Sequence, residues 1–435
     1  MRFLRSARFL AVAIVAVAIS LGAYAYFAKG EEAAAPSYKT EAEKDLFVRF
    51  VMEGYDSIME NYWAKTSEKD LANHFQLSLQ KAQNSILMPV LANISRSGTA
   101  AMIEAALSAA TSTDAKKRLA LDTLNVALYN LEPVGRNGLL SQTQETAFRE
   151  DVANVDSSKD LYEDLGLKKG ASEEEVRLAY EAKAEALLSD PSPEAKEKLE
   201  KIAYAKSVLA DPNTKDLYDE AKIEPTASKS VYGKTLYMKI DRISPTTLLE
   251  FARGVYAATT TPGLDSMIID LRGNLGGALD FAAAFLGLFL GQNQYAFDLF
   301  HQGDYEVQRT SQPRFPELSR YKEIAVLTDG MTQSTAEVTA AAFKRFKLGT
   351  VIGEPTRGWG TVENTFPLQS TVDEKDKYLL LLVHSITLRD DGGPVEGRGV
   401  DPDIDTRNPS WSSELSSKID SSSLVKAVKD ALSGR

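Results

Sequence analysis

The chain of 435 residues contains no cysteine and only three histidines. Without cysteine there is neither a disulfide nor a thiol nucleophile, and His74, His301 and His384 are too few for a histidine-rich zinc site. Basic residues are outnumbered, with 50 Lys and Arg against 61 Asp and Glu, which gives a formal net charge of -11. This balance argues against a phosphate-backbone partner, so the sequence predicts no nucleic-acid binding. No metal and no cofactor are predicted either.

One long apolar run stands at the N-terminus, from Phe9 to Ala28, after arginines at positions 2, 5 and 8. The run is longer than a usual cleaved signal and has about the length that spans a bilayer. Residues 1-30 are therefore predicted to be an export signal that stays as a transmembrane anchor, with the rest of the chain extracytoplasmic in the cell envelope. The small-x-small triplet at residues 23–25 keeps a cleaved signal as the alternative.

Helical periodicity dominates residues 37-155, which we expect to form a helical platform. Apolar side chains recur at steps of three and four on one stripe of a helix: Phe47, Val51, Tyr55, Ile58 and Tyr62. A break at residues 132–138, EPVGRNG, precedes Ser141 and Gln144. These two residues have the spacing of a capping box that starts another helix.

Residues 160-222 carry a separate helical pattern, with two periodic stretches on either side of SDPSP. They resemble a J-domain in a set of packing residues: Tyr162, Leu165, Gly166, Ala179, Tyr180, Leu209, Asp211 and Tyr218. The H-P-D tripeptide of that family is replaced by Ser189, Asp190 and Pro191, and the first long helix is rich in glutamate where the family has a basic face. The resemblance implies a degenerate helical hairpin that serves as a scaffold, with a working co-chaperone as the alternative.

Alternating strand and helix patterns occupy residues 230-408, followed by a Ser-rich, weakly helical tail over 409-435. LYMKIDRI (236–243) alternates as a half-buried strand, 244–258 is helical, and SMIID (266–270) has the pattern of a fully buried strand. These patterns predict an α/β domain.

Four motifs follow one another from residue 232 to residue 403. They are LYMKIDRI with its helix, IIDLRGNLGG (268–277), VLTDGMTQSTAEV (326–338) with VIGEPTRGWGTVE (351–363), and EGRGVDPDI (396–404). In this order they resemble the C-terminal processing (tail-specific) serine peptidases, which implies a ClpP/crotonase-like α/β peptidase core. In typical family members a PDZ-type domain that captures the substrate's C-terminus stands where this chain has its J-like segment.

The resemblance assigns the nucleophile position to Ser334, at a junction between a strand and a helix that would present its hydroxyl to a cleft. The N–H of Thr335, together with the turn at Gly276 and Gly277, would then stabilise an oxyanion. Glycine suits this role because a backbone without Cβ can approach the reacting carbonyl closely. A tight turn is the compatible structural explanation of the two glycines.

The lysine base of the family is missing. Its string E-P-T-F-G-K-G-T-V-Q aligns without gaps with EPTRGWGTVE, which puts Trp359 at the lysine position and Glu363 at that of the accompanying glutamine. An indole has no basic nitrogen, so Trp359 is unable to deprotonate Ser334. We expect its ring to be largely buried, in the channel between a strand at 353–362 and the helix that starts at Ser334.

Few other side chains qualify as the base. If residues 353–362 form a strand, Glu363 shares a face with Trp359 and is the remaining candidate, provided that burial raises its pKa. Lys344 and Lys347 are expected to face solvent, and His384 is expected to be a satisfied core residue.

Together these patterns predict a multidomain α/β protein with a helical platform, a J-like helical hairpin and a peptidase-like core. The resemblance implies a cell-envelope family member that is catalytically impaired and binds a polypeptide substrate or client protein, or assembles with partner proteases or with copies of itself. The alternative is an active serine-type endopeptidase that uses Ser334 with Glu363 or an unrecognised base.

Overall fold

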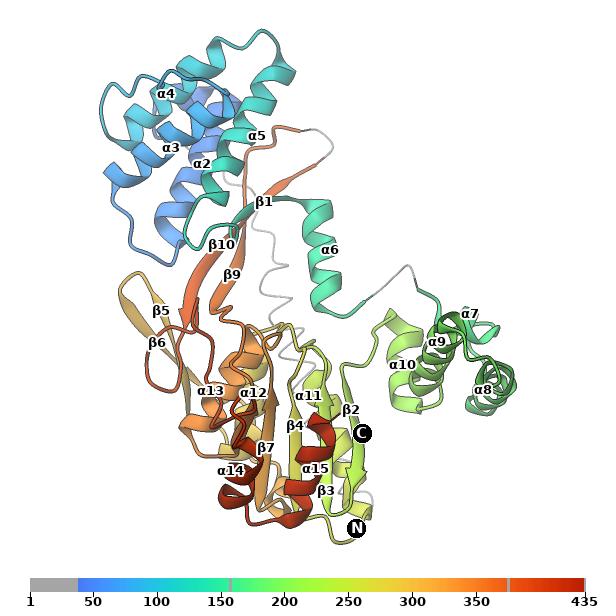
Figure 1. Cartoon of the computed structure of the whole chain (residues 1–435). Coiled ribbons are helices and arrows are strands. Elements are labelled where there is room, and N and C mark those ends of the chain that lie inside the picture. Colours follow the sequence, from blue (N-terminus) through green and yellow to red (C-terminus); the bar gives the residue numbers. More distant parts are fainter. Residues whose placement is uncertain (1–37, 156–158, 374–375, 434–435) are drawn as a thin grey trace.

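The computed structural model describes residues 38–155, 159–373 and 376–433 (Figure 1). The predicted signal segment, residues 1-30, lies outside these described residues. Within the ranges that are described, no helix has the length and apolar character needed to cross a membrane.

The N-terminal platform is a bundle of helices: η1 Glu41–Lys44, α2 Leu46–Asn61, α3 Glu68–Ala82, α4 Arg96–Ser108 and α5 Thr113–Tyr129. Side-chain oxygens cap the N-termini of the four long helices, supplied by Asp45, Ser67, Ser95 and Ser112. The predicted apolar stripe of α2 is confirmed, because Val51, Tyr55 and Ile58 are buried in the core of the bundle.

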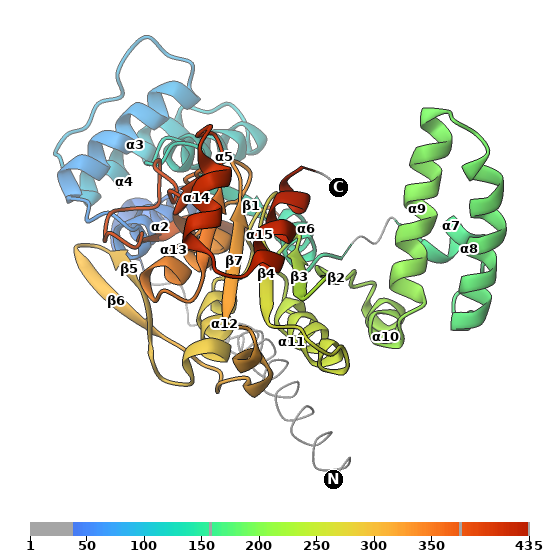
Figure 2. The same cartoon turned by 60° about the horizontal axis from the view of Figure 1, so that its bottom comes forward.

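The chain leaves the platform through β1 Gly138–Ser141 and α6 Gln142–Val152, and the predicted capping box of Ser141 and Gln144 starts α6. The J-like segment follows as α7 Leu161–Leu165, α8 Glu173–Leu188, α9 Pro193–Leu209 and α10 Pro212–Ala221. Its helices enclose their own apolar cluster and stand apart from the rest of the molecule (Figure 2). Residues 173–209 thus form the predicted helical hairpin.

A six-stranded sheet of order β11-β8-β7-β4-β3-β2 forms the centre of the α/β core. Its strands are β2 Ala227–Tyr232, β3 Thr235–Ile240, β4 Ser266–Asp270, β7 Glu323–Thr328, β8 Thr350–Gly353 and β11 Ile404–Asp405. All neighbours are parallel except the β2–β3 pair. The predicted buried strand SMIID is β4, in the middle of this sheet.

Helices cover both faces of this sheet. One face packs on α11 Thr247–Ala257, α12 Asp280–Leu290 and α13 Thr335–Arg345, and the other packs on α14 Trp411–Lys418 and α15 Ser422–Leu432. Short 3-10 turns, η2 Ala258–Thr260 and η3 Pro316–Arg320, complete the helical elements. In β4, Met267 and Ile269 contact the first layer and Ile268 the second, which explains why this strand is apolar without alternation.

A second, antiparallel sheet joins the platform to the core. It contains β1, β5 Tyr295–His301, β6 Asp304–Arg309, β9 Thr361–Pro367 and β10 Tyr378–Thr387. The β9–β10 ribbon rises from the α/β core to the helical bundle (Figure 1), where Leu380 and Leu382 join the apolar core of the platform. At its other end, β10 pairs with β5 beside the core. The site described next lies at the start of this ribbon.

Candidate active site

Ser334 stands directly before α13, after the short loop that follows β7. Its backbone has a φ of 56° and a ψ of -127°. This conformation is strained for a residue with a Cβ, and a sharp turn of this kind before a helix is typical of nucleophilic serines. Ser334 therefore has the backbone geometry that its predicted role requires.

The glycine turn after β4 lies directly against Ser334. A Cβ added to Gly276 would stand 2.6 Å from the Cβ of Ser334 and 3.1 Å from its Oγ, and Gly276 has a φ of +85°. A Cβ on Gly277 would stand only 1.7 Å from the carbonyl oxygen of Ile243. Only glycine fits at either position, so the turn brings bare backbone against the nucleophile position.

Thr335 fastens helix α13 to this turn, because its hydroxyl donates to the carbonyl oxygen of Gly277 at 2.7 Å. The N–H of Gly276 donates to Oδ1 of Asn274 at 2.8 Å, so this one of the three predicted oxyanion donors is already occupied. Within the described part of the chain, the backbone N–H groups of Gly277 and Thr335 have no acceptor. These two donors stay available to a bound carbonyl oxygen.

Glu337 joins the turn at Ser334 to the loop at residues 354–360. Its Oε2 accepts the N–H groups of Ser334 and Trp359, both at 2.8 Å. Its Oε1 accepts the N–H of Gly358 at 2.7 Å and the hydroxyl of Thr356 at 2.5 Å. The side chain is fully buried, and this burial raises the pKa of Glu337 against the opposing effect of its hydrogen bonds.

Sequence reasoning missed Glu337. The signal that could have found it is its position three residues after Ser334, where a glutamate reaches back to the N–H of the residue that caps the helix. The carboxylate sets the relative positions of Ser334 and Trp359, because one oxygen atom binds both backbone nitrogens.

Trp359 lies in a loop, whereas a strand was expected at 353–362. Strand β8 ends at Gly353 and β9 begins at Thr361, and the intervening loop wraps around the carboxylate of Glu337. The indole is partly buried and lies outside the apolar clusters of the core. Instead, the guanidinium of Arg136 stacks on it, with Cζ 3.3 Å from the ring centroid, and the guanidinium of Arg357 lies at 5.7 Å. The expectation that the ring is largely buried in a channel between a strand and the helix that starts at Ser334 is therefore wrong.

Arg136 reaches this site from the EPVGRNG break just before β1. Because β1 pairs with β10 and β10 pairs with β9, the segment before β1 lies beside the start of the β9–β10 ribbon. Arg136 forms an ion pair with Glu396 at 3.1 Å, and Glu396 accepts the N–H of Gly360 at 2.8 Å. Sequence reasoning placed neither Arg136 nor Glu396 in the site.

Glu363, on β9, binds the edge of the indole. Its Oε1 accepts the hydroxyl of Thr361 at 2.5 Å and the indole N–H of Trp359 at 3.4 Å. Burial raises the pKa of Glu363 above its ordinary value. In the residues that the structure describes, no side chain forms a hydrogen bond with Oγ of Ser334, Glu363 included.

The other candidate bases, two lysines and a histidine, form no hydrogen bond with Ser334 either. Lys344 was expected to face solvent, but its Nζ donates to the carbonyl oxygen of Asp401 at 2.6 Å and lies 3.5 Å from the carboxylate of Asp390. Lys347 is exposed, as expected. His384 stacks on the ring of His301, with centroids 4.1 Å apart, and burial lowers its pKa.

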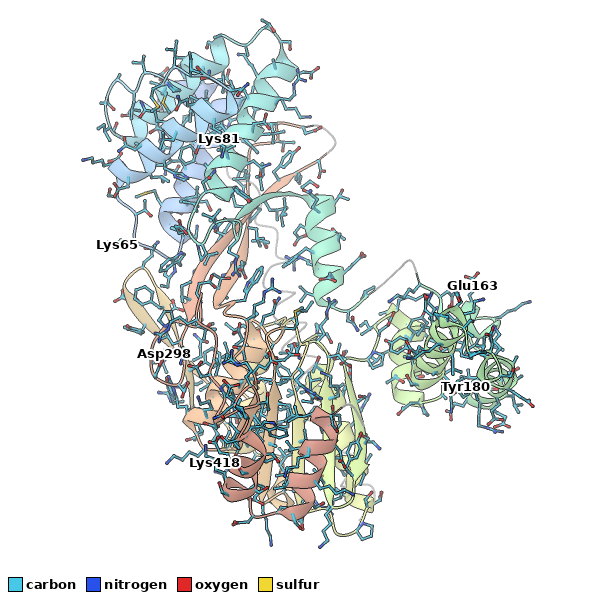
Figure 3. The ribbon with its side chains drawn as sticks, in the orientation of Figure 1. Lys65, Lys81, Glu163, Tyr180, Asp298 and Lys418 are labelled. Carbon is cyan, nitrogen blue, oxygen red and sulfur yellow. The ribbon has the colours of Figure 1, made fainter. Side chains whose placement is uncertain are left out.

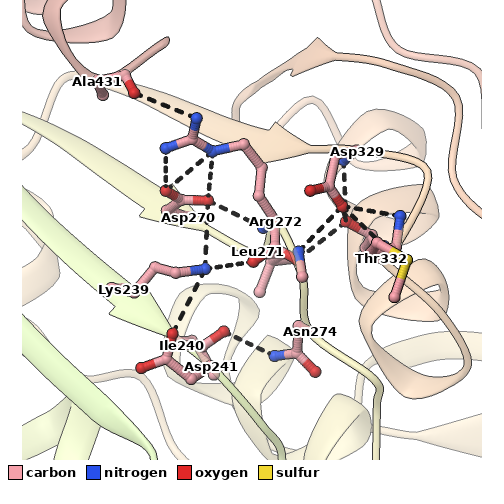
Figure 4. A network of polar contacts seen from close by, with 12 residues as sticks. Lys239, Ile240, Asp241, Asp270, Leu271, Arg272, Asn274, Asp329, Thr332 and Ala431 are labelled. Carbon is pink, nitrogen blue, oxygen red and sulfur yellow. Dashed lines mark hydrogen bonds and ion pairs between the residues drawn. The ribbon is translucent and has the colours of Figure 1, made fainter. Parts of the chain in front are cut away.

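An ion network fixes the strand end that precedes the glycine turn (Figure 4). The fully buried Asp270 accepts hydrogen bonds from Arg272 at 2.6 Å and from the hydroxyl of Tyr237 at 2.5 Å, and the ammonium of Lys239 lies 3.7 Å away. Burial alone would raise the pKa of Asp270, but Arg272 and Lys239 outweigh it and hold the pKa below its ordinary value. Lys239 is thus bound within the network.

Two stretches of the chain match known families. Residues 160–219 match the DnaJ domain, and residues 234–406 match the model of peptidase family S41. Residues 234–406 are thus similar to peptidase family S41. The resemblance of this stretch to C-terminal processing peptidases is thereby confirmed, and so is the J-like character of the preceding helices.

The stretch that matches S41 is similar to curated bacterial proteins. A probable CtpA-like serine protease of Staphylococcus aureus is 30% identical over 151 residues, which cover 35% of this chain and 29% of that protein. The corresponding protein of Staphylococcus haemolyticus is 30% identical over 177 residues, 39% of this chain and 34% of that protein. The match therefore spans about a third of these relatives' own length. The solved photosystem II D1 C-terminal processing protease is 12% identical, with a TM-score of 0.47, and the match covers 82% of this chain and 92% of that one.

The S41 core keeps a strained serine, a glycine turn and two backbone donors that would polarise a carbonyl oxygen. At the lysine position it has an aromatic ring on which the guanidinium of Arg136 stacks. This arrangement is suited to bind a peptide carbonyl, and among the described side chains none forms a hydrogen bond with Oγ of Ser334.

Proposed function

We propose that this chain is an extracytoplasmic, membrane-anchored member of the S41 family that binds polypeptide segments beside Ser334 without efficient cleavage. The observation that carries the proposal is the occupant of the lysine position. The indole of Trp359 stands there, stacked on Arg136 and bound at its edge by Glu363.

The chemistry of these neighbours supports loss of catalysis. A serine hydroxyl is almost entirely protonated at neutral pH, so nucleophilic attack needs a group that accepts its proton. The indole has only an N–H donor, and the guanidinium groups of Arg136 and Arg357 carry N–H donors and no acceptor. None of these side chains is able to act as the base.

The same geometry supports retention of binding. The N–H groups of Gly277 and Thr335 are positioned by the glycine turn and by the Thr335 hydroxyl. They would hold a main-chain carbonyl of a polypeptide, either a client protein or a partner protease. Assembly with further copies of this chain is part of the same proposal.

The proposed location rests on the sequence of the N-terminal segment. The arginines before Phe9 and the apolar run to Ala28 have the pattern of a signal anchor. An extracytoplasmic J-like segment would be separated from ATP-driven cytoplasmic chaperones, which supports a structural role for α7 to α10.

A second candidate function is an active serine endopeptidase with Glu363 as the base. The observation that favours it is the raised pKa of Glu363 next to the lysine position, because a more basic carboxylate is a better proton acceptor. Its weakness is geometric, since Glu363 contacts the indole and no hydrogen bond joins it to Ser334.

Hydrolysis of an unfolded protein such as casein by the purified full chain tests the proposal. We expect no hydrolysis above that of Ser334→Ala, together with binding of fluorescent unfolded polypeptide by both proteins. Hydrolysis that disappears in Ser334→Ala would refute loss of catalysis. If it also disappears in Glu363→Gln but persists in Glu354→Gln, an exposed glutamate of the same loop region, the second candidate is correct.

A further inference from the structure

The connection between α3 and α4, residues 83–95, is an exposed apolar segment that we call the strap. Five of its side chains are largely exposed: Ile86 at 95%, Leu87 at 74%, Met88 at 48%, Val90 at 83% and Ile94 at 52%. Its sequence, QNSILMPVLANIS, contains no charged residue although 26% of the whole chain is charged. Single exposed apolar residues are ordinary on a protein surface, but a contiguous group of this kind marks an interaction site.

The strap is held along α3 by hydrogen bonds from side chains to its backbone. The amide of Gln76 donates to the carbonyl oxygen of Pro89 at 2.8 Å, and proline has no N–H of its own. The hydroxyl of Ser85 accepts the N–H of Leu87 at 3.0 Å and donates to its carbonyl oxygen at 3.1 Å. A backbone group that already has a hydrogen-bond partner enters an apolar medium at a lower cost in free energy. The bonds at Leu87 and Pro89 therefore lower the cost of moving this part of the strap into lipid.

The end of the strap lies beside the point where the described chain begins. Arg96, the residue after the strap, pairs with Asp56 at 2.6 Å and with Glu43 at 2.7 Å. Lys39 pairs with the same Asp56 at 3.0 Å. The ten residues from Lys29 to Tyr38 separate the apolar N-terminal run from Lys39 and reach about 35 Å at most when extended. A retained anchor would therefore keep the strap close to the bilayer surface.

We propose that the strap is a membrane-contact surface whose apolar side chains enter the interface of the lipid bilayer. This inference rests on the proposed anchor, which brings the strap to the membrane. The strap lies on the outer side of the platform, away from α7 to α10 (Figure 2), and begins two residues after Lys81, which is labelled in Figure 3. Because the strap itself is uncharged, its insertion requires no anionic lipid, which a protein of net charge -11 would repel.

The absence of cysteine allows a direct test on the full chain. Leu87→Cys and Leu188→Cys form a matched pair, because Leu87 is 74% and Leu188 72% exposed, and Leu188 ends α8 in the J-like segment. Each variant is labelled with a polarity-sensitive dye and reconstituted into phosphatidylcholine vesicles with brominated acyl chains. We expect the emission at position 87 to shift to the blue and to lose most of its intensity, with neither change at position 188.

Four further outcomes are decisive. Adding Val90→Asp to Leu87→Cys should abolish the quenching, since a carboxylate opposes entry into the interface. If the chain sediments with vesicles but the dye at position 87 is not quenched, the proposed membrane anchor is supported and the strap inference is wrong. A blue shift without quenching that grows with protein concentration overturns the inference in favour of a second copy on the strap. If the chain does not sediment and position 87 is not quenched, the anchor and the strap inference both fail.

Discussion

The J-like segment and the S41-like core each carry other residues where the motif that they resemble has its working group, but in different surroundings. In the J-like segment, Ser189, Asp190 and Pro191 occupy an exposed loop between α8 and α9. Their polar contacts are local, such as that from the N–H of Ser192 to Asp190 at 2.9 Å. The segment has its own apolar cluster, in which Leu161, Val208 and Leu209 are buried.

In the S41 core, the replaced position contacts segments that are far apart in the chain. Trp359 binds Glu337 through its backbone, Glu363 through its indole N–H and Arg136 through its ring. An exposed loop can lose its working residues without adjustment elsewhere. A half-buried position can accept an indole only if its neighbours provide partners for it, and here arginine and glutamate side chains do so.

The largest effect that this comparison predicts is from Glu337→Ala. The substitution leaves four donors without their acceptor, each at a cost of about 1 to 3 kcal/mol. We expect the free energy of unfolding of the core to fall by at least about 4 kcal/mol in urea titrations. The control is Asp190→Ala in the exposed J-like loop, which should leave the unfolding midpoint unchanged. An equal loss in both variants would contradict the comparison.

A smaller loss is expected from Trp359→Ala. The ring is partly buried and its main partner is a cation, so we expect a loss of about 1 to 3 kcal/mol from area and stacking. Phe285→Ala, at a fully buried ring of the core, should cost about 3 to 5 kcal/mol and is the reference. Urea unfolding of the two variants measures the difference, and similar losses would show that Trp359 is a core residue after all.

The effect of Glu363→Gln should depend on pH. Because burial raises the folded pKa of Glu363, the unfolded chain releases this proton at a lower pH than the folded chain. The carboxyl group therefore lowers the free energy of unfolding progressively as the pH rises above 4.5, the ordinary pKa of a glutamate. We expect Glu363→Gln to be more stable than the unchanged chain at neutral pH and equal to it at pH values below 4.5.

Unfolding midpoints over a pH series measure this effect. Glu185→Gln, on the exposed surface of α8, is the matched control in the J-like segment and should not alter the pH dependence. A loss of stability in Glu363→Gln at neutral pH would show that the carboxylate is needed to hold Trp359 and Thr361.

The smallest effect is expected where the family tripeptide is restored by Ser189→His, Asp190→Pro and Pro191→Asp. The first turn of α8 would still carry Glu173, Glu174 and Glu175, which repel the acidic surface that a basic J-domain face binds. We expect no stimulation of a chaperone ATPase by the variant in steady-state assays. Stimulation would show that the tripeptide alone separates this segment from a working co-chaperone.

Local sequence signals predicted the elements of the fold well. The stripe on α2, the capping box of α6 and the apolar strand β4 depend on neighbours within a few residues, and all three are found in the structure. The loop at 354–360 was expected to be a strand because the resemblance places the family's lysine position on one. Its conformation depends on Glu337, which lies 22 residues before Trp359, and no local pattern reports that contact.

By itself, the sequence determined which family patterns are present and which groups are missing from them, since Trp359 and Ser189 are read directly from an alignment of motifs. Only the tertiary structure decided which side chains surround the residues that replace these groups. Arg136 and Glu396 are 260 residues apart, and the pairing of β1, β10 and β9 brings them together at Trp359. The physical reason is that hydrogen-bonded strands carry distant segments to one place, whereas periodicity and capping act only along the chain.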